Sequence, residues 1–193
     1  MKVMFDITFL GTSASVPSAD RSHPSLLVEA GGRRVMVDCG EGTQRQLLRS
    51  GAGFRRLDRL LLTHGHFDHV LGIPGLFSTL RLRQSSDLMT VHGGQGTLDV
   101  VVQMLAGLWG EGRAPIPLEL VPLAEGRVLD VGEFTIDCFC VPPRHRQLRL
   151  PFREPGTAAS SARSPGGTRR AGPSPARVEF DDDRSLLSRT RGA

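Results

Sequence analysis

The stretch Thr63-His64-Gly65-His66-Phe67-Asp68-His69 contains three of the six histidines of this chain and one carboxylate. It directly follows an apolar run, residues 57–62. A run of this kind that stops at a cluster of donor side chains predicts a buried strand ending at a functional site. Imidazole and carboxylate donors without cysteine favour zinc, with manganese or iron as alternatives. Coincidental histidines on a surface loop are a poorer explanation, because the donors are so dense.

The spacing of the four donors suits two neighbouring metal ions. In an extended segment, residues two apart point the same way, so His64 and His66 are expected to bind one ion. Phe67 is expected to turn the loop, so that Asp68 and His69 face a second ion. Metal ions about 3.5–4 Å apart suit the hydrolysis of phosphoryl and acyl groups. A zinc-bound water can have a pKa near ~7, and Asp68 is the candidate for proton transfer.

The remaining histidines divide into one candidate ligand and two ordinary residues. His145 follows the end of another predicted strand, and we predict that it joins His64 and His66 as a third ligand. His23 and His92 are predicted to be ordinary surface or core histidines. The small-residue loop 11–18 either brings backbone N–H groups to a phosphate or to the metal site, or is an ordinary turn.

Length and charge indicate one domain followed by a basic tail. A chain of 193 residues can build one packed core. The net charge of +4 arises in residues 146–193, which carry ten arginines and five acids, whereas residues 1–145 carry 14 basic and 15 acidic groups. The basic composition is therefore weak evidence for nucleic-acid binding by residues 1–145.

Cysteine usage and hydropathy favour a cytoplasmic protein. The three cysteines are odd in number, and their spacing matches neither a zinc knuckle nor a disulfide framework. Residues 1–6 include an early acid and do not resemble a signal peptide. No segment approaches the ~20 apolar residues that span a bilayer, so we expect no membrane association.

Alternating and apolar runs predict a layered α/β fold. Strands are expected over residues 3–10, 25–29, 33–38, 57–62, 88–91, 118–123, 127–131 and 133–141. Helices are expected over residues 43–49, from Pro74 to Leu82, and over residues 98–108, where apolar residues recur at helical spacing. Strands dominate, and helices are expected to cover a mainly mixed sheet.

The composition changes at about Arg146. Of the last 48 residues, 22 are Pro, Gly, Ser or Ala, and apolar periodicity is lost. Such a segment cannot bury enough apolar surface to offset its ordering entropy, so residues 146–193 are predicted to be a disordered basic tail. A frameshift is a second explanation. The chain has 23 arginines and one lysine, which suggests a GC-rich gene whose shifted frames would encode these residue types.

Besides the histidine motif, three further stretches resemble known proteins, and they point to one family within a larger group. The motif itself resembles the signature of the metallo-β-lactamase fold hydrolases. Residues 9–17 (Phe9-Leu10-Gly11-Thr12-Ser13-Ala14-Ser15-Val16-Pro17) resemble the first loop of the ribonuclease Z family. Residues 38–46 (Asp38-Cys39-Gly40-Glu41-Gly42-Thr43-Gln44-Arg45-Gln46) resemble that family's most distinctive stretch, and Gly72-Ile73-Pro74-Gly75-Leu76 follows the histidine motif as it does there. The resemblance covers residues 3 to about 146.

The resemblance implies a four-layer αββα sandwich, usually a homodimer, that uses two zinc ions to cleave precursor tRNA on the 3′ side of the acceptor stem. It places His64, His66 and His145 on one zinc ion. It places Asp68 and His69 on the other, with Asp68 also as general base. Asp38 would lie near the site as a supporting group.

Two departures limit this expectation. Phe67 replaces a residue that is commonly glycine in the family. More importantly, nothing after His145 supplies the family's bridging Asp, its later zinc-binding His or its further catalytic His. We therefore expect residues 1–145 to form a partial metallo-β-lactamase-like domain, with the first half of the sandwich largely present and the second half missing. With five of seven expected ligands, the chain is predicted to bind zinc weakly and to show little or no activity. The alternatives are a general hydrolase of a small ester or thioester and an inactive fragment.

Overall fold

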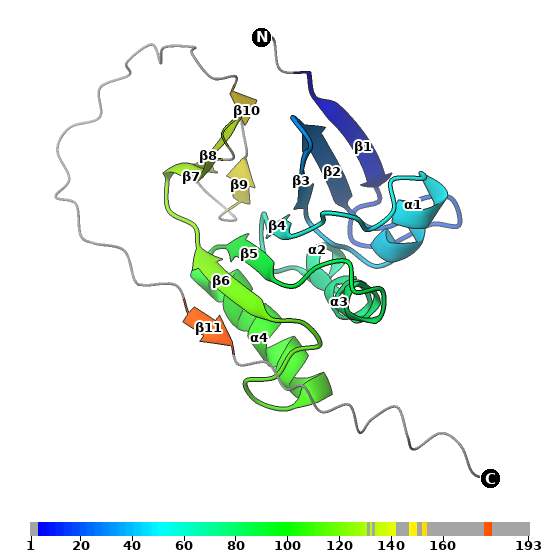
Figure 1. Cartoon of the computed structure of the whole chain (residues 1–193), viewed down its shortest axis with the longest axis vertical. Helices are drawn as coiled ribbons and strands as arrows, with labels where there is room; N and C mark the ends of the chain where they lie inside the picture. The colour runs from blue at the N-terminus through cyan, green and yellow to red at the C-terminus, as the bar shows by residue number, and fades with distance from the viewer. Residues whose placement is uncertain are drawn as a thin grey trace, which may run out of the picture.

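The structure is a computed structural model and describes residues 4–130, 132, 134–141, 147–149, 152–153 and 176–178. Its main sheet has seven strands in the order β1-β2-β3-β4-β5-β6-β11 (Figure 1). Their bounds are β1 Asp6–Gly11, β2 Ser25–Ala30, β3 Arg33–Val37, β4 Arg59–Leu61, β5 Met89–Gly93, β6 Leu118–Pro122 and β11 Ala176–Val178. The pairings β3–β4, β4–β5 and β5–β6 are parallel, and the pairings β1–β2, β2–β3 and β6–β11 are antiparallel. The sheet is therefore mixed, as the sequence predicts.

One face of the main sheet is covered by helices. The helices are α1 Thr43–Arg49, α2 Phe67–Val70, α3 Ile73–Leu82 and α4 Gln95–Trp109. Pairing places one row of side chains on this face across five adjacent strands, namely Leu27, Met36, Leu60, Val91 and Leu120. All five belong to one apolar core, to which each of the four helices contributes buried residues. This core fixes the helices, including the short α2 that follows the histidine motif.

A smaller sheet covers the opposite face. It has the order β10-β8-β7, with β9 also paired to β8, and its strands are β7 Gly126–Asp130, β8 Thr135–Val141, β9 Gln147–Arg149 and β10 Phe152–Arg153. Phe134 and Ile136 pack between the sheets against Val35 and Leu61. The Phe134 ring meets Phe5 edge to face, with 5.3 Å between the ring centroids. This second core joins the two sheets into a sandwich.

The layers observed are helix, sheet and sheet, which confirms the predicted fold class. None of the four helices contributes to the core between the sheets. Within the described part of the chain the fourth layer of an αββα sandwich is absent. No described helix is long and apolar enough to cross a membrane. The predicted tail, residues 146–193, lies largely outside the described residues, and its disorder stays a prediction.

Candidate metal centre

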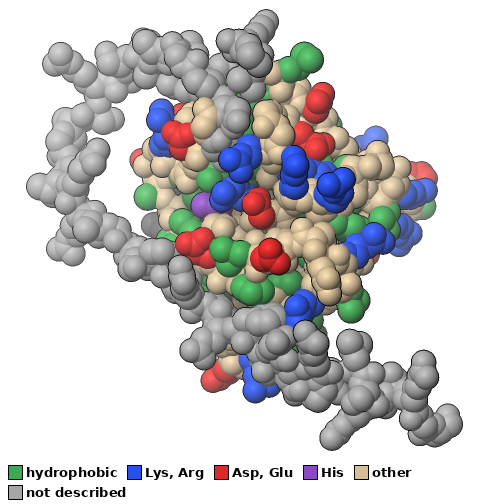
Figure 2. All heavy atoms as spheres, viewed as in Figure 1, with side chains coloured by type: hydrophobic (Ala, Val, Ile, Leu, Met, Phe, Trp, Pro, Cys, Tyr) green, Lys and Arg blue, Asp and Glu red, His purple; other side chains and the backbone are tan. Residues whose placement is uncertain are grey.

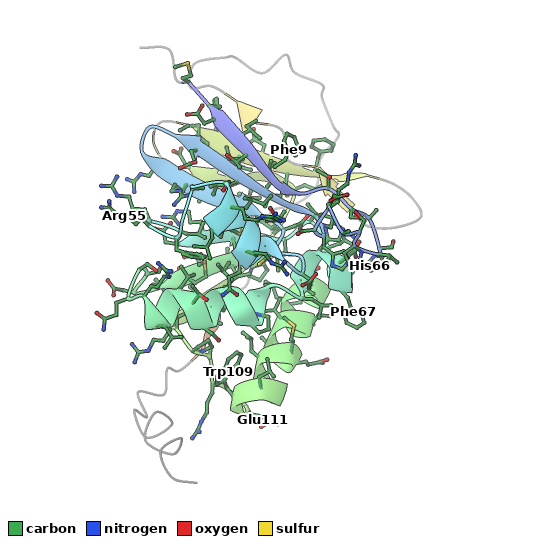
Figure 3. The ribbon with its side chains drawn as sticks, turned by 90° about the vertical axis from the view of Figure 1, so that its right-hand side faces the viewer. Phe9, Arg55, His66, Phe67, Trp109 and Glu111 are labelled. Carbon is green, nitrogen blue, oxygen red and sulfur yellow. The ribbon has the colours of Figure 1, made fainter. Side chains whose placement is uncertain are left out.

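The predicted site residues gather at the carboxyl ends of β3 and β4. Val37 and Leu61 are paired in parallel, so Asp38 and Thr63, which follow these strands, emerge at the same edge of the sheet. The chain then passes through His66, whose extended backbone (φ −69°, ψ 148°) leads into α2. In Figure 3, His66 and Phe67 lie at one side of the molecule and Arg55 lies at the other. Phe67 points into solvent, with 70% of its surface exposed.

Asp38 connects three segments of this site. Its Oδ1 accepts the backbone N–H of Thr63 at 2.8 Å, and the Thr63 hydroxyl lies 3.0 and 2.9 Å from its two carboxylate oxygens. Its Oδ2 lies 2.7 Å from Nδ1 of His69, which belongs to α2. Asp38 is buried and has a left-handed backbone (φ 59°), a conformation that Asp adopts more easily than most residues. One carboxylate therefore links the ends of β3 and β4 to α2.

The three imidazole rings of the motif lie against one another. The ring centroids of His64 and His66 are 4.5 Å apart, and those of His64 and His69 are 4.0 Å apart. Nδ1 of His64 lies 3.0 Å from the Thr63 hydroxyl, as Nδ1 of His69 lies beside Asp38. In both rings Nε2 is thus the atom that can be offered to a metal ion. Orientation of a histidine ligand by a carboxylate or hydroxyl on its other nitrogen is typical of metal sites.

Asp68 is held by the loop that follows β1. The backbone N–H of Ser15 donates to its Oδ2 at 2.8 Å, and the same oxygen lies 3.6 Å from Nε2 of His69. The backbone of Ser15 is left-handed (φ 60°), and the loop is closed by a bond from the N–H of Ser13 to the carbonyl of Ser22 at 3.0 Å. Of the two readings of loop 11–18, the structure favours the one in which a backbone N–H reaches the site. Sequence reasoning did not identify Ser15 itself.

Close backbone packing fixes α2 against the segment after β3. A Cβ added to Gly40 would lie 2.3 Å from the carbonyl oxygen of Asp68 and 2.4 Å from Cβ of His23. The N–H of Cys39 donates to the carbonyl of His69 at 2.8 Å, and the N–H of Gly72 donates to the carbonyl of Cys39 at 2.9 Å. Only glycine fits at position 40, which explains in part why the stretch beginning at Asp38 has its particular sequence.

The electrostatics of the site favour the metal-binding protonation state at His64 and Asp68 and oppose it at His69. Burial and the neighbouring imidazoles His69 and His66 lower the pKa of His64. Burial raises the pKa of Asp68, but the Ser15 N–H and the His69 charge outweigh it, so the net shift is downward. Burial likewise opposes protonation of His69, yet the hydrogen bond and charge of Asp38 raise its pKa overall. Neutral His64 and ionised Asp68 are the forms that ligate metals.

Three other side chains of types that can bind metal ions, Cys39, His23 and His92, do not belong to the donor cluster. Cys39 is fully buried, and burial raises the pKa of its thiol; we therefore assign it to the core. His23 and His92 are also buried, and neither ring has a hydrogen-bond partner among the described residues. Both fit the predicted role of ordinary histidines, although His23 lies beside Gly40 and close to Asp68.

The structure thus brings together five of the six predicted site residues, namely Asp38, His64, His66, Asp68 and His69. His145 lies outside the described residues. Among the described residues, no group of three His, Cys, Asp or Glu side chains is arranged so that it could hold one metal ion. The donor types and the anchored Nδ1 atoms nevertheless fit zinc.

Comparisons with known proteins agree with this geometry. The ribonuclease Z of Bradyrhizobium diazoefficiens is 77% identical over 143 residues, which are 74% of this chain and 47% of the relative. That of Archaeoglobus fulgidus is 36% identical over 137 residues, which are 71% of this chain and 44% of the relative. The structure of the short form of human tRNase Z is 27% identical with a TM-score of 0.62, and the match covers 79% of this chain and 66% of that one.

These matches confirm the resemblance to ribonuclease Z that the sequence motifs predict. The chain spans about half the length of the curated relatives it matches. The family profile described as the metallo-beta-lactamase superfamily matches residues 19–137, which include Asp38 and the whole histidine motif. On this evidence the chain belongs to the metallo-β-lactamase superfamily.

Proposed function

We propose that this chain carries the zinc-binding half of an endoribonuclease that removes the 3′ trailer of precursor tRNA. The observation that carries the proposal is the cluster of three imidazoles anchored by Asp38, with 2.7 Å between Oδ2 of Asp38 and Nδ1 of His69. It lies in a chain that is 77% identical over 143 residues to a ribonuclease Z. The alternative, a general hydrolase of a small ester or thioester, has no comparable support.

We assign His64, His66 and His145 to one zinc ion, and Asp68 and His69 to a second. The first assignment is supported by the contact between the rings of His64 and His66. The second is supported by the 3.6 Å separation between Oδ2 of Asp68 and Nε2 of His69. Asp38 supports the site by orienting His69 and does not itself bind metal.

Each group has a distinct part in phosphodiester hydrolysis. Bound zinc would polarise the scissile phosphate and lower the pKa of the attacking water. Asp68 is ionised at neutral pH, because the ordinary carboxyl pKa of 3.8 is well below 7 and the surroundings of Asp68 lower its pKa further. Its carboxylate can therefore accept a proton from that water. The Ser15 N–H, 2.8 Å from Oδ2, keeps the carboxylate oriented for this transfer.

We further propose that the 193-residue chain, taken alone, binds zinc weakly and cleaves RNA slowly. The described residues supply four of the seven donors that the ribonuclease Z resemblance implies, and His145 would be a fifth. The second zinc ion would have only Asp68 and His69 from this chain. From the same resemblance we infer that the complete enzyme is cytoplasmic and forms a homodimer. Sedimentation of the purified protein can test the dimer.

A chimera tests this proposal directly. Residues 1–141 of this chain would be joined to the remaining part of the Bradyrhizobium diazoefficiens ribonuclease Z. The substrate is a precursor tRNA with a labelled 3′ trailer, incubated with added zinc. We expect the chimera to release the trailer at one site and leave a 3′ hydroxyl, and the 193-residue chain to be at least a hundredfold slower.

Matched variants separate the possible results. His64→Ala and Asp68→Ala in the chimera should abolish cleavage, whereas Asp99→Asn, on exposed α4 surface, should leave it unchanged. A folded, zinc-loaded chimera that hydrolyses a panel of thioesters but leaves precursor tRNA intact would favour the general hydrolase. A folded, zinc-loaded chimera without either activity would contradict the assignment of this segment to a working nuclease.

A further inference from the structure

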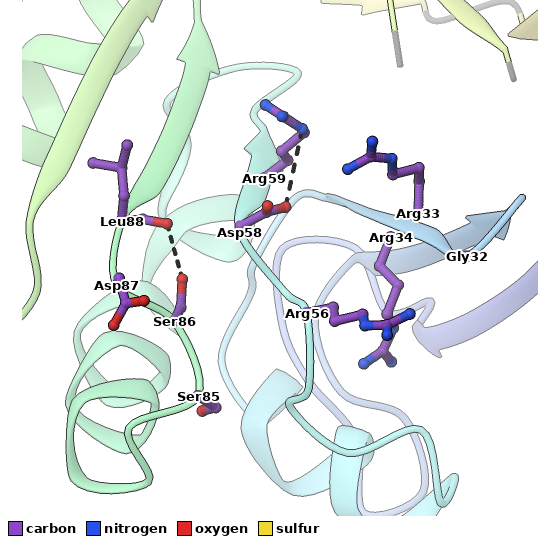
Figure 4. A pocket seen from close by; sticks show the side chains of 10 residues that line it. All are labelled: Gly32, Arg33, Arg34, Arg56, Asp58, Arg59, Ser85, Ser86, Asp87 and Leu88. Carbon is purple, nitrogen blue, oxygen red and sulfur yellow. Dashed lines mark hydrogen bonds and ion pairs between the residues drawn. The ribbon is translucent and has the colours of Figure 1, made fainter. Parts of the chain in front are cut away.

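A hollow lined by arginines lies at the opposite end of the parallel strands from the histidine cluster. Its volume is about 460 Å³, within the range of small-molecule sites. Arg33 and Arg34 come from the start of β3, Arg59 from the start of β4, and Arg56 from the loop before β4. Figure 4 shows the segment Ser85–Leu88 on one side of the hollow and Arg33, Arg34 and Arg56 on the other, with Asp58 and Arg59 between them. On the face seen in Figure 2, basic side chains gather near the centre, with acidic side chains among them.

Arg34 builds the wall of this hollow. Only 8% of its surface is exposed, and its guanidinium donates to the carbonyl of Arg55 at 2.5 Å and to that of Ala52 at 3.1 Å. Its Nε also forms an ion pair with Glu29 at 2.8 Å. The charge of Arg34 is therefore neutralised, and its role is to fix the loop that carries Arg56.

Two arginines at the hollow have no partner. The side chains of Arg33 and Arg56 are exposed, and neither makes a hydrogen bond or an ion pair within the described part of the chain. Arg56 also has a left-handed backbone (φ 55°), which is uncommon for a long side chain and occurs often at functional sites. The loop before β4 thus holds Arg56 in an uncommon backbone conformation and leaves its guanidinium exposed.

The charge at the hollow suits an anion. Arg59 has one weak ion pair, with 3.9 Å between its Nε and Oδ1 of Asp58. Three arginines, Arg33, Arg56 and Arg59, face two acids, Asp58 and Asp87, so one positive charge is left over. Guanidinium groups bind phosphate oxygens in pairs of parallel hydrogen bonds. One phosphodiester, with its single negative charge, would balance the hollow, whereas a phosphate monoester carries close to two negative charges at neutral pH.

We propose that this hollow is a second phosphate-binding site, separate from the metal centre. At about 3.3 Å per strand residue, the four steps from Arg59 to Thr63 place it roughly 13 Å from the histidine motif. Its arginine side chains can bind phosphate without a metal ion. The phosphate can belong to a free nucleotide or to the backbone of an RNA, and the experiment separates these sources.

The test uses the 193-residue protein in EDTA, so that metal-dependent binding cannot contribute. Calorimetry would measure adenosine 5′-monophosphate, and fluorescence anisotropy would measure a labelled ten-nucleotide oligouridylate. Arg33→Gln and Arg56→Gln should each weaken binding about tenfold, because a hydrogen bond to a charged group contributes about 1.5–3 kcal/mol. Both side chains are exposed and unpaired, so folding should be unaffected.

Arg49→Gln is the matched control, because Arg49 is an exposed arginine at the end of α1, away from the hollow. It should leave both affinities within about twofold of the unmodified protein. Binding of the RNA alone, lost in the pocket variants, would identify a nucleic-acid backbone as the source. Binding of the mononucleotide as well would identify a site for free phosphate compounds. Absence of both, or an equal loss in Arg49→Gln, would overturn the proposal whether or not the metal centre cleaves RNA.

Discussion

Oδ2 of Asp38 lies 2.7 Å from Nδ1 of His69, although 31 residues separate them in the sequence. The same carboxylate receives the backbone N–H of Thr63 at 2.8 Å. Asp38 therefore ties α2 to the ends of two parallel strands, and the orientation of the His69 ring depends on it.

In the chimera described above, Asp38→Asn should weaken binding of the second zinc ion, assigned to Asp68 and His69, about 10- to 100-fold. Asparagine keeps the shape and can still accept the Thr63 N–H, but it lacks the charge that orients the His69 ring. Competition with a chromophoric chelator measures the affinity. Asp6→Asn, an exposed position on β1, is the control and should have no effect. Equal affinities of the chimera with and without Asp38→Asn would show that Asp38 does not orient a ligand.

Acid should destabilise the fold through His92. Burial, followed by the Arg59 charge, lowers the pKa of His92 from 6.5 to about 4. Between these values the unfolded chain binds a proton that the folded chain does not, so stability falls as the pH drops from 6.5 to 4. The loss attributable to His92 is about 3 kcal/mol and is complete below the folded pKa.

Urea unfolding of the unmodified chain and of His92→Gln at pH 7 and pH 4.5 measures this contribution. The difference in unfolding free energy between the two pH values should be smaller in the variant by about 2 kcal/mol or more. Identical pH dependence in both proteins would rule out His92 as the source.

Gly40→Ala should destabilise the chain by about 3 kcal/mol and disturb the metal centre. The added methyl group would meet the carbonyl oxygen of Asp68 at 2.3 Å, and overpacking against backbone cannot be relieved by a side-chain rotation. Gly107→Ala is the control. Position 107 lies in α4 with open space around it, so alanine there should stabilise the helix by about 1 kcal/mol. Thermal unfolding that ranks the two variants in the reverse order would contradict the packing described.

Phe134→Ala should cost about 3–5 kcal/mol of unfolding free energy. Phe134 is fully buried between the two sheets and packs edge to face against Phe5. Phe139, on the neighbouring strand β8, has 42% of its surface exposed, and Phe139→Ala should cost much less. Urea unfolding compares the two. A loss below about 1 kcal/mol in Phe134→Ala would mean that the sheets do not share this core.

Local patterns were enough to predict most elements and the donor cluster. The helical spacing over residues 98–108 identifies α4, which extends from Gln95 to Trp109. The proposed donors of the candidate metal centre, His64 to His69, lie close together in sequence, so they could be predicted without tertiary information.

The features that sequence did not reveal depend on distant partners. The strand predicted over residues 57–62 is regular only over Arg59–Leu61, because pairing with β3 and β5 sets its bounds. The four-residue helix α2 is too short for a periodic signal and was expected to be a turn. The bonds from Ser15 to Asp68 and from Arg34 to the 52–55 loop link segments that only the folded chain brings together.

Zinc binding by the 193-residue chain tests the central claim, that residues 64–69 form half of a dinuclear zinc site. Metal analysis after dialysis, with chelator competition, would be made on the unmodified chain and on the double variant His64→Ala/His66→Ala. We predict at most one weakly held zinc ion per chain, lost in the double variant. Two tightly held zinc ions, or zinc binding that survives the double substitution, would contradict the account.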